Sequence, residues 1–307
     1  KEQWPTVING VYIFWTSGLP IFHTTLDSGK AEINQILFAG ISSAINMFIK
    51  ELAHSDLESI NIEDGTLKYS VHKKLIFVIH CTGKKGSSLG GFLLWQIRTE
   101  FLKQYAQIIE NSPDSFVDSS LFHPFNSTVN KIHNDLLLLF DKHENLFNYI
   151  PAKIPLSLIQ ELLKEGDNLI EGFPNDTIRL IRRLDTKYEE EVKEPIMFSL
   201  GVYFGIEISK KIFPNRVGIN QTEVLKLLNE ISVTKLDKKS HLFTLTICPI
   251  CRGKSSTNPM CHFFAGFIEG GFDNPKLHII EETCKAKGDQ YCTFKISSDR
   301  DTHKLMH

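Results

Sequence analysis

Five of the six cysteines in this chain of 307 residues fall in one stretch of 45 residues. They are Cys248, Cys251, Cys261, Cys284 and Cys292. Thiolates are preferred ligands of Zn²⁺, which takes four donors in a tetrahedron. A metal ion held in this way ties separate segments to one point. The cluster therefore predicts a metal site that organises the fold of this part of the chain.

Other interpretations of the cysteines exist. A cysteine is often a small buried apolar residue, and this is our expectation for the isolated Cys81. A disulfide between Cys248 and Cys251 would close a strained loop and is disfavoured in a reducing cytoplasm. A catalytic zinc keeps one coordination position open, whereas four protein ligands close the shell. The spacing favours a structural zinc over a catalytic one.

The composition is that of a globular protein with two domains. Hydrophobic residues make up 42% of the chain and charged residues 23%, so each half can bury a core. The net charge of −2 argues against a large basic surface for nucleic acid. Polar residues interrupt the most apolar windows, such as 33–49 and 195–206, so no transmembrane segment or signal peptide is predicted. We expect a cytoplasmic protein, peripheral to membranes at most.

The first 110 residues alternate between β-rich and helical patterns. Strands are expected at 10–15, 21–26, 57–63, 66–71 and 75–81, an amphipathic helix at 33–52, and a helix capped by Ser87 or Ser88 that runs to 109. The resulting order is β-β-α-β-β-β-α. One antiparallel sheet with helices on a face satisfies this order.

The remaining residues are richer in helices. Helices are expected at 129–140, 156–163, 176–183, 196–213, 220–231 and 261–272, and strands at 242–247, 277–284 and 291–296. The last two strands form a hairpin closed by Lys287-Gly288-Asp289. Its turn lies between Cys284 and Cys292, so the two sulfurs can converge. The predicted fold class is α+β with two domains.

The first hairpin carries Tyr12-Ile13-Phe14 and Gly18-Leu19-Pro20-Ile21-Phe22. With the element order, it resembles the longin/roadblock superfamily over residues 5–125. The resemblance implies an antiparallel sheet with helices. It also implies that small GTPases or other longin-type domains bind the sheet edge or the long helix.

Three later stretches, 261–272, 281–284 and 288–296, resemble the 4-vinyl-reductase-type domain over residues 175–298. That domain occurs in archaeal ligand-binding proteins, in sensor domains of aromatic-responsive activators and, at the fold level, in subunits of TRAPP trafficking complexes. The resemblance implies a structural zinc held by Cys261, Glu281, Cys284 and Cys292. Cys248 and Cys251 lie outside this set, where they would either replace Glu281 or form a redox pair.

Together these patterns predict a longin/roadblock-like domain at 1–126, a helical connector at 127–174 and a zinc-containing domain at 175–300. The function that the resemblances imply is a non-catalytic regulatory or scaffold protein related to archaeal vesicle-trafficking machinery. Its partners would be a small GTPase or a longin-type protein, and it would form a homo-oligomer such as a dimer.

Two other functions stay open. Gly201 and Gly205 share one helix face, which indicates either close helix packing or room for an apolar ligand or acyl chain beside Phe198, Tyr203 and Phe204. The second case would make the chain a small-molecule or lipid sensor. A reductase accessory subunit is the third hypothesis. The chain has no dinucleotide fingerprint, catalytic triad or paired-carboxylate motif, so we expect no enzyme, no catalytic residue and no cofactor other than zinc.

Overall fold

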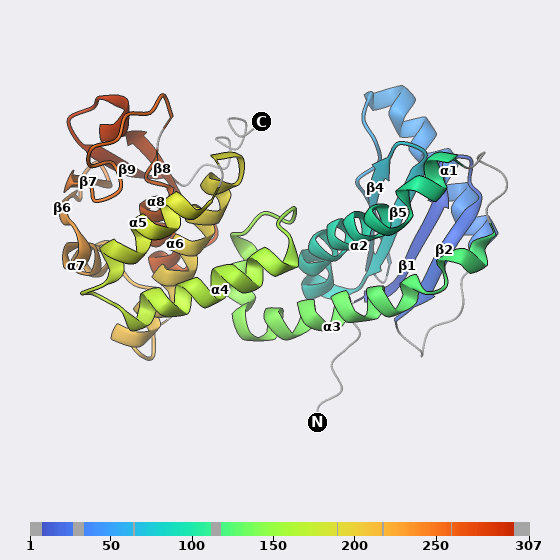
Figure 1. Cartoon of the computed structure of the whole chain (residues 1–307), viewed down its shortest axis with the longest axis horizontal. Helices are drawn as coiled ribbons and strands as arrows, with labels where there is room; N and C mark the ends of the chain where they lie inside the picture. Colours follow the sequence, from blue (N-terminus) through green and yellow to red (C-terminus); the bar gives the residue numbers. More distant parts are fainter. Residues whose placement is uncertain are drawn as a thin grey trace. The chain divides into compact units, whose positions relative to one another are not determined.

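The computed structural model describes residues 8–26, 34–63, 65–111, 118–188, 190–216, 218–258 and 260–297 (Figure 1). The chain divides into two compact units. Unit 1 comprises Lys1–Phe147 and Ala152–Leu156, and unit 2 comprises Asn148–Pro151 and Ser157–His307. The boundaries at 126 and 174, with a connector between them, stay predictions.

Unit 1 contains a five-stranded antiparallel sheet in the order β2-β1-β5-β4-β3. The strands are β1 Ile8–Trp15, β2 Pro20–Thr25, β3 Ser59–Ile62, β4 Gly65–His72 and β5 Leu75–Cys81. The helices are α1 Gln35–Ala53, α2 Gly83–Asn111 and α3 Phe125–His143, with short 3₁₀ helices at Ser119–Phe122 and Glu144–Asn148. The order β-β-α-β-β-β-α that the sequence predicts is confirmed.

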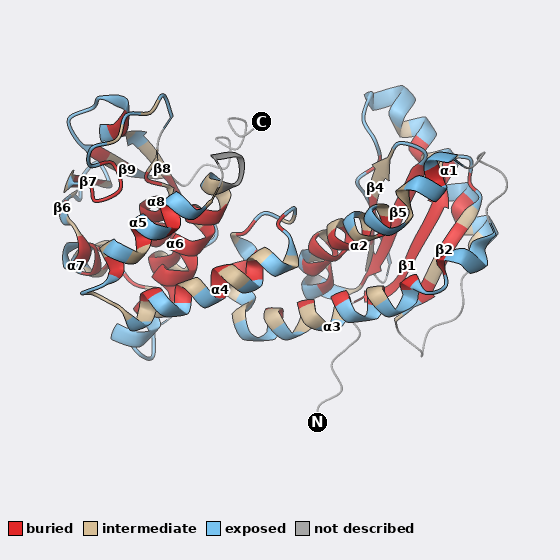
Figure 2. Cartoon of the chain, in the orientation of Figure 1, coloured by how far each residue is buried: buried red, intermediate tan, exposed pale blue. Residues whose placement is uncertain are grey.

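Helices cover both faces of this sheet, where the sequence predicted one. Successive strand residues point to opposite faces. Ile76 and Val78 pack in the cluster that includes Ala39 of α1, whereas the ring of Phe77 lies 5.7 Å from that of Phe101 in α2. Burial on both faces explains why every residue of β1 and β5 is buried (Figure 2).

The start of α2 also differs from the sequence prediction. The helix begins at Gly83, so Ser87 and Ser88 lie within it and do not cap it. Gly83 has a φ of 65°, which a glycine adopts without steric cost.

Unit 2 combines five helices with a four-stranded antiparallel sheet in the order β6-β7-β9-β8. The helices are α4 Leu156–Glu171, α5 Thr177–Lys187, α6 Glu190–Ile212, α7 Gln221–Ile231 and α8 His262–Phe272. The strands are β6 Val233–Asp237, β7 Leu242–Ile247, β8 His278–Thr283 and β9 Cys292–Ser297, with a 3₁₀ turn at Lys285–Lys287. The sequence did not predict β6, and the predicted end of α4 is eight residues too early.

Helices α6 and α8 pack backbone against backbone. A Cβ added at Gly201 would overlap the carbonyl oxygen of Phe263, and one added at Gly266 would overlap that of Phe198. Gly205 and Gly270 meet the partner helix in the same way. These glycines therefore serve close packing, and the hypothesis that they leave room for an apolar ligand is wrong for this contact.

Candidate metal centre

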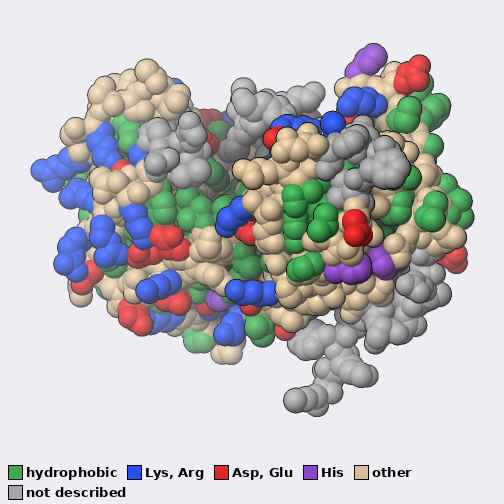
Figure 3. Space-filling model, turned by 45° about the vertical axis from the view of Figure 1, so that its right-hand side comes forward, with side chains coloured by type: hydrophobic (Ala, Val, Ile, Leu, Met, Phe, Trp, Pro, Cys, Tyr) green, Lys and Arg blue, Asp and Glu red, His purple; other side chains and the backbone are tan. Residues whose placement is uncertain are grey.

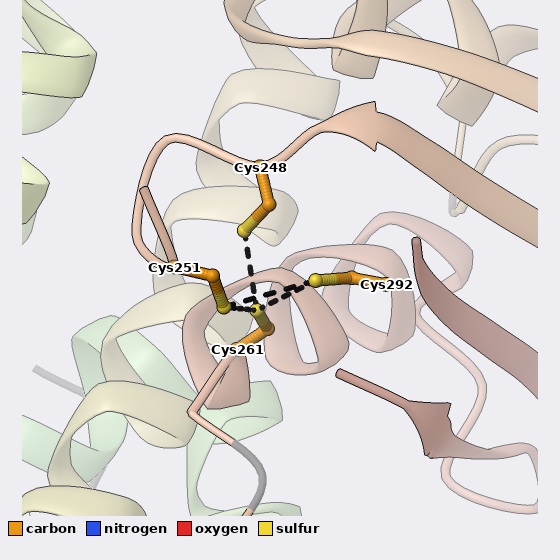
Figure 4. Close-up of side chains that lie close together, drawn as sticks. All are labelled: Cys248, Cys251, Cys261 and Cys292. Carbon is orange, nitrogen blue, oxygen red and sulfur yellow. Dashed lines mark hydrogen bonds between the residues drawn. The ribbon is translucent and has the colours of Figure 1, made fainter. Parts of the chain in front are cut away.

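Six potential metal ligands converge at one end of the unit 2 sheet. Cys248 and Cys251 lie in the turn after β7, Cys261 precedes the first residue of α8, and Cys292 begins β9 (Figure 4). The other two are Glu281 in β8 and Cys284, which follows that strand. All five cysteines are free thiols, and none is more than 3% exposed.

The sulfur of Cys251 lies at the centre of the cluster. Its Sγ is 3.0 Å from that of Cys261, 3.4 Å from that of Cys284 and 3.7 Å from that of Cys292. The Sγ atoms of Cys261 and Cys292 are 3.5 Å apart. With Zn–S bonds of about 2.3 Å, a tetrahedral thiolate shell has sulfurs about 3.8 Å apart. The spacing suits one metal ion, because an iron–sulfur cluster places iron and sulfide atoms between its cysteines and holds them farther apart.

Two overlapping groups of four donors lie within 4.8 Å of one another. One group consists of Cys248, Cys251, Cys261 and Cys292, and the other of Cys261, Glu281, Cys284 and Cys292. The second is the ligand set that the sequence resemblance implies. Cys261 and Cys292 belong to both groups. The structure thus brings the Cys-x-x-Cys pair into the cluster, and more donors are present than one tetrahedral ion needs.

Glu281 is oriented into the cluster. Its Oε2 accepts a hydrogen bond from the backbone N–H of Cys261 at 3.0 Å. Its Oε1 is buried and has no hydrogen-bond partner. A buried carboxylate oxygen without a partner is costly, and a metal ion or a proton would satisfy it. Cys248 lies at the other side of the cluster, where its Sγ is 3.2 Å from that of Cys261.

The protonation of the cluster reflects its burial. Burial, together with the charge of Cys284, raises the pKa of Glu281 to about 9. Hydrogen bonds from the Cys261 thiol and from backbone groups lower the pKa of Cys284 to about 4, despite burial. Contacts with the four other thiols raise the pKa of Cys261. A cation that binds here displaces protons, because thiolates and carboxylates bind metals in their deprotonated forms.

Polar contacts hold the segments that carry the donors. Arg182 of α5 donates from Nε to the carbonyl oxygen of Pro249 at 2.9 Å, which fixes the Cys248–Cys251 turn. Asp289 accepts the backbone N–H of Cys284 at 2.8 Å, within the hairpin turn that the sequence predicts. No sequence pattern indicated the Arg182 contact, because the two partners are 67 residues apart.

Cys81 takes no part in this centre. It lies in unit 1, where it is buried among apolar residues, and burial raises the pKa of its thiol to about 12. The expectation of a small buried residue is met.

Comparison with known proteins identifies one domain. Residues 243–298 match the vinyl-4-reductase domain family. The matched segment includes all six donors of the metal centre, so the chain carries a domain of this family there, as the sequence resemblance implies. No described feature shows that unit 1 is a longin domain, and that assignment stays a prediction.

Similar proteins come from the archaeon Methanocaldococcus jannaschii. Uncharacterized protein MJ0150 is 28% identical over 110 residues, which cover 34% of this chain and 64% of that protein. Uncharacterized protein MJ0745 is 24% identical over 207 residues, 66% of this chain and 94% of that protein. Uncharacterized protein MJ1642 is 30% identical over 101 residues, 31% of this chain and 60% of that protein. These names state no activity.

A crystal structure of a vinyl-4-reductase family protein from the same archaeon is also similar. It shares 16% identity and covers 43% of this chain and 94% of that chain, with a TM-score of 0.29. A score this low supports no structural inference about the present chain.

Proposed function

We propose that the chain is a non-catalytic regulatory or scaffold protein whose vinyl-4-reductase domain is stabilised by one structural zinc ion. Cys251, Cys261, Cys284 and Cys292 would hold the metal. The observation that carries this proposal is the convergence of these four buried sulfurs, with spacings of 3.0–3.7 Å between the measured pairs. Glu281 and Cys248 would lie beside the ion outside its shell.

The chemistry of the donors supports zinc and a structural role. Thiolate ligands favour Zn²⁺ among the common divalent metals of cells, and four protein ligands leave no position for a substrate. The ion would join three segments that are distant in sequence: the turn after β7, the start of α8 and the β8–β9 hairpin. We infer that the metal maintains the domain and that function resides on binding surfaces.

Metal analysis of single-residue variants tests this ligand set. Purified wild-type protein should contain one zinc per chain by inductively coupled plasma mass spectrometry. Cys251→Ser should lose the metal, whereas Cys248→Ser and Glu281→Gln should retain it. Loss of zinc in Glu281→Gln with retention in Cys251→Ser would instead establish the set that the sequence resemblance implies.

The partner class is a finer part of the proposal. The element order of unit 1 supports its resemblance to longin domains, and the vinyl-4-reductase domain is compatible with a regulatory role. A small GTPase or a longin-type protein is the partner that both resemblances imply, within machinery related to vesicle trafficking. A pull-down and a nucleotide-exchange assay with small GTPases from the same source test this part. Absence of binding to all of them would remove it and leave the metal site unaffected.

A small-molecule sensor is the second candidate, because a vinyl-4-reductase domain is also compatible with ligand binding. The packing of α6 against α8 leaves no room at their glycines. An open depression of about 580 Å³ lies instead at the start of α7, lined by polar residues and Phe272. Native mass spectrometry of gently purified protein should show a co-purified ligand if this candidate is correct. A clean mass, with no thermal shift from phenols or fatty acids, would remove it.

A further inference from the structure

Helix α1 is oriented with its polar side chains toward the sheet. Ser42 lies 3.2 Å from the Tyr69 hydroxyl, Ser43 donates to the carbonyl oxygen of Thr16, and Asn46 accepts the backbone N–H of Leu57 at 2.9 Å. All three side chains are buried. These specific hydrogen bonds fix the rotation of α1 about its axis, because turning the helix would leave buried polar groups without partners.

The opposite side of α1 is apolar and exposed. Six large hydrophobic residues on it are 51–71% exposed: Ile36, Leu37, Ile41, Met47, Phe48 and Leu52. In Figure 3 hydrophobic side chains gather along the right-hand edge of unit 1, where Figure 1 places α1. We call this set the α1 face. It offers on the order of 600 Å² of apolar surface, the upper limit of what a monomer commonly exposes.

Small residues lie in the middle of the α1 face. Gly40 and Ala44 are exposed and one helical turn apart, between the large residues of the first and last turns. A Cβ added at Gly40 would meet nothing within 4 Å. Small residues spaced by four let two helices approach closely. The large side chains of a second α1 helix would pack over this depression.

The charge of the face favours an equally uncharged partner. The helix contains no charged residue from Gln35 to Ile49, and Lys50 is paired with Asp56 at 3.2 Å. A face with large residues at both ends and small residues in the middle is self-complementary, as a two-fold interface requires. Two copies would together bury about 1,200 Å², which reaches the range of specific interfaces.

A lipid surface is the main alternative occupant. By length and composition α1 would also suffice to cross a membrane, a result that the sequence pattern did not predict. Its inward side is bound to the sheet through buried serine and asparagine side chains, so lipid cannot surround it. Helices that lie on membranes carry Lys and Arg along their polar side, and α1 has only Lys50.

We propose that the α1 face is the interface of a homodimer, in which α1 of one copy packs against α1 of the other. This interface belongs to unit 1 and does not depend on the metal centre of unit 2.

Sedimentation velocity over a micromolar concentration series tests the proposal with full-length protein. Wild type should form dimers. Phe48→Glu and, separately, Ile41→Lys should each raise the dimer dissociation constant at least about 100-fold, because a charge would be buried at the centre of the contact. Leu138→Glu is the matched control, since Leu138 is a similarly exposed leucine residue on α3 of the same unit. Circular dichroism checks that each variant is folded.

The other outcomes overturn the proposal. A monomer at all concentrations would exclude the dimer, and flotation of that monomer with lipid vesicles would assign the face to a membrane. A dimer that withstands both α1 substitutions would place the interface elsewhere. The two substitutions are separate, so one folded variant suffices for the decision.

Discussion

The two sheets of this protein are stabilised in different ways. The five-stranded sheet of unit 1 is covered on both faces, and every residue of its strands β1 and β5 is buried. In the four-stranded sheet of unit 2, β7 and β9 bury only alternate residues along most of their length. The segments that flank this sheet meet instead at the cysteine cluster. Apolar burial therefore suffices for unit 1, whereas unit 2 depends on a cross-link by metal.

The largest expected effect is that of Cys261→Ser, which removes a donor common to both ligand groups. Structural zinc contributes on the order of 10 kcal/mol to the folding of small domains. We expect this variant to lose its metal and to unfold unit 2 while unit 1 stays folded. Hydrogen exchange followed by mass spectrometry measures protection in β7 and β9 against that in β1 and β5.

Cys81→Ser is the matched control, because Cys81 is a buried cysteine of unit 1 outside the cluster. It should keep its zinc and the protection of unit 2. Equal loss of protection in both units of Cys261→Ser would contradict the separation that the comparison draws.

The next effect concerns the close packing of α6 on α8. In Gly201→Ala the new methyl group would overlap the backbone of Phe263, which should cost about 3 kcal/mol or more of unfolding free energy. Gly91→Ala in α2 of unit 1 places its methyl group at an ordinary distance of 3.4 Å from Ala152. That control should stabilise its helix by about 0.5–1 kcal/mol. Chemical denaturation measures both, and a neutral Gly201→Ala would show that the helices have space to separate.

A pH effect of similar size should arise at Glu269 in α8. Burial raises the pKa of this carboxyl to about 7, although the backbone N–H of Ile279 donates to it at 3.0 Å, and His278 lies 3.7 Å away. The folded state thus holds a proton that the unfolded chain releases near its ordinary value of 4.5. Stability is greatest below that value and falls as pH rises to about 7, by on the order of 3 kcal/mol.

Glu269→Gln keeps an acceptor for the Ile279 N–H and removes the titration. Its unfolding free energy between the two pH values should therefore be nearly flat, apart from other groups shared with wild type. Urea titrations of both proteins at several pH values measure this difference. An identical pH dependence in the two proteins would show that Glu269 does not titrate in this range.

The smallest effect should come from the helix caps. Asn220 caps α7 with a complete capping box, in which Glu223 bonds back to the Asn220 backbone. Asn34 caps α1 with a single hydrogen bond to the N–H of Leu37. Asn220→Ala should cost about 1 kcal/mol, and Asn34→Ala less, in thermal unfolding of the respective units. A larger loss from Asn34→Ala would reverse this ranking.

Local patterns in the sequence predicted most of the elements. The alternation of β-rich and helical segments predicted the order of unit 1, and the Gly288-Asp289 turn predicted the β8–β9 hairpin. Strand β6 was missed because Val233–Asp237 contains only two apolar residues. The end of α4 was missed because Gly166 interrupts the pattern. That glycine lies against the ring of Tyr203, a residue of a later helix, so its role is visible only in the folded chain.

Two features needed the tertiary structure. The apolar pattern of α1 identified an amphipathic helix, yet it does not reveal that buried hydrogen bonds turn the apolar side outward. The sequence resemblance assigned Glu281 to the metal, and only the distances show Cys251 in contact with three other sulfurs. Spacing along the chain identifies donors, but it does not rank six donors that the fold brings to one point.

The most direct test of the central claim is to remove the metal from the wild-type protein and follow both units. Zinc content and hydrogen exchange would be measured before and after treatment with a strong chelator, and again after zinc is restored. We predict one zinc per chain, loss of protection confined to unit 2 when it is removed, and recovery when it returns. A protein that binds no metal, or a unit 2 that keeps its protection without it, would contradict this account.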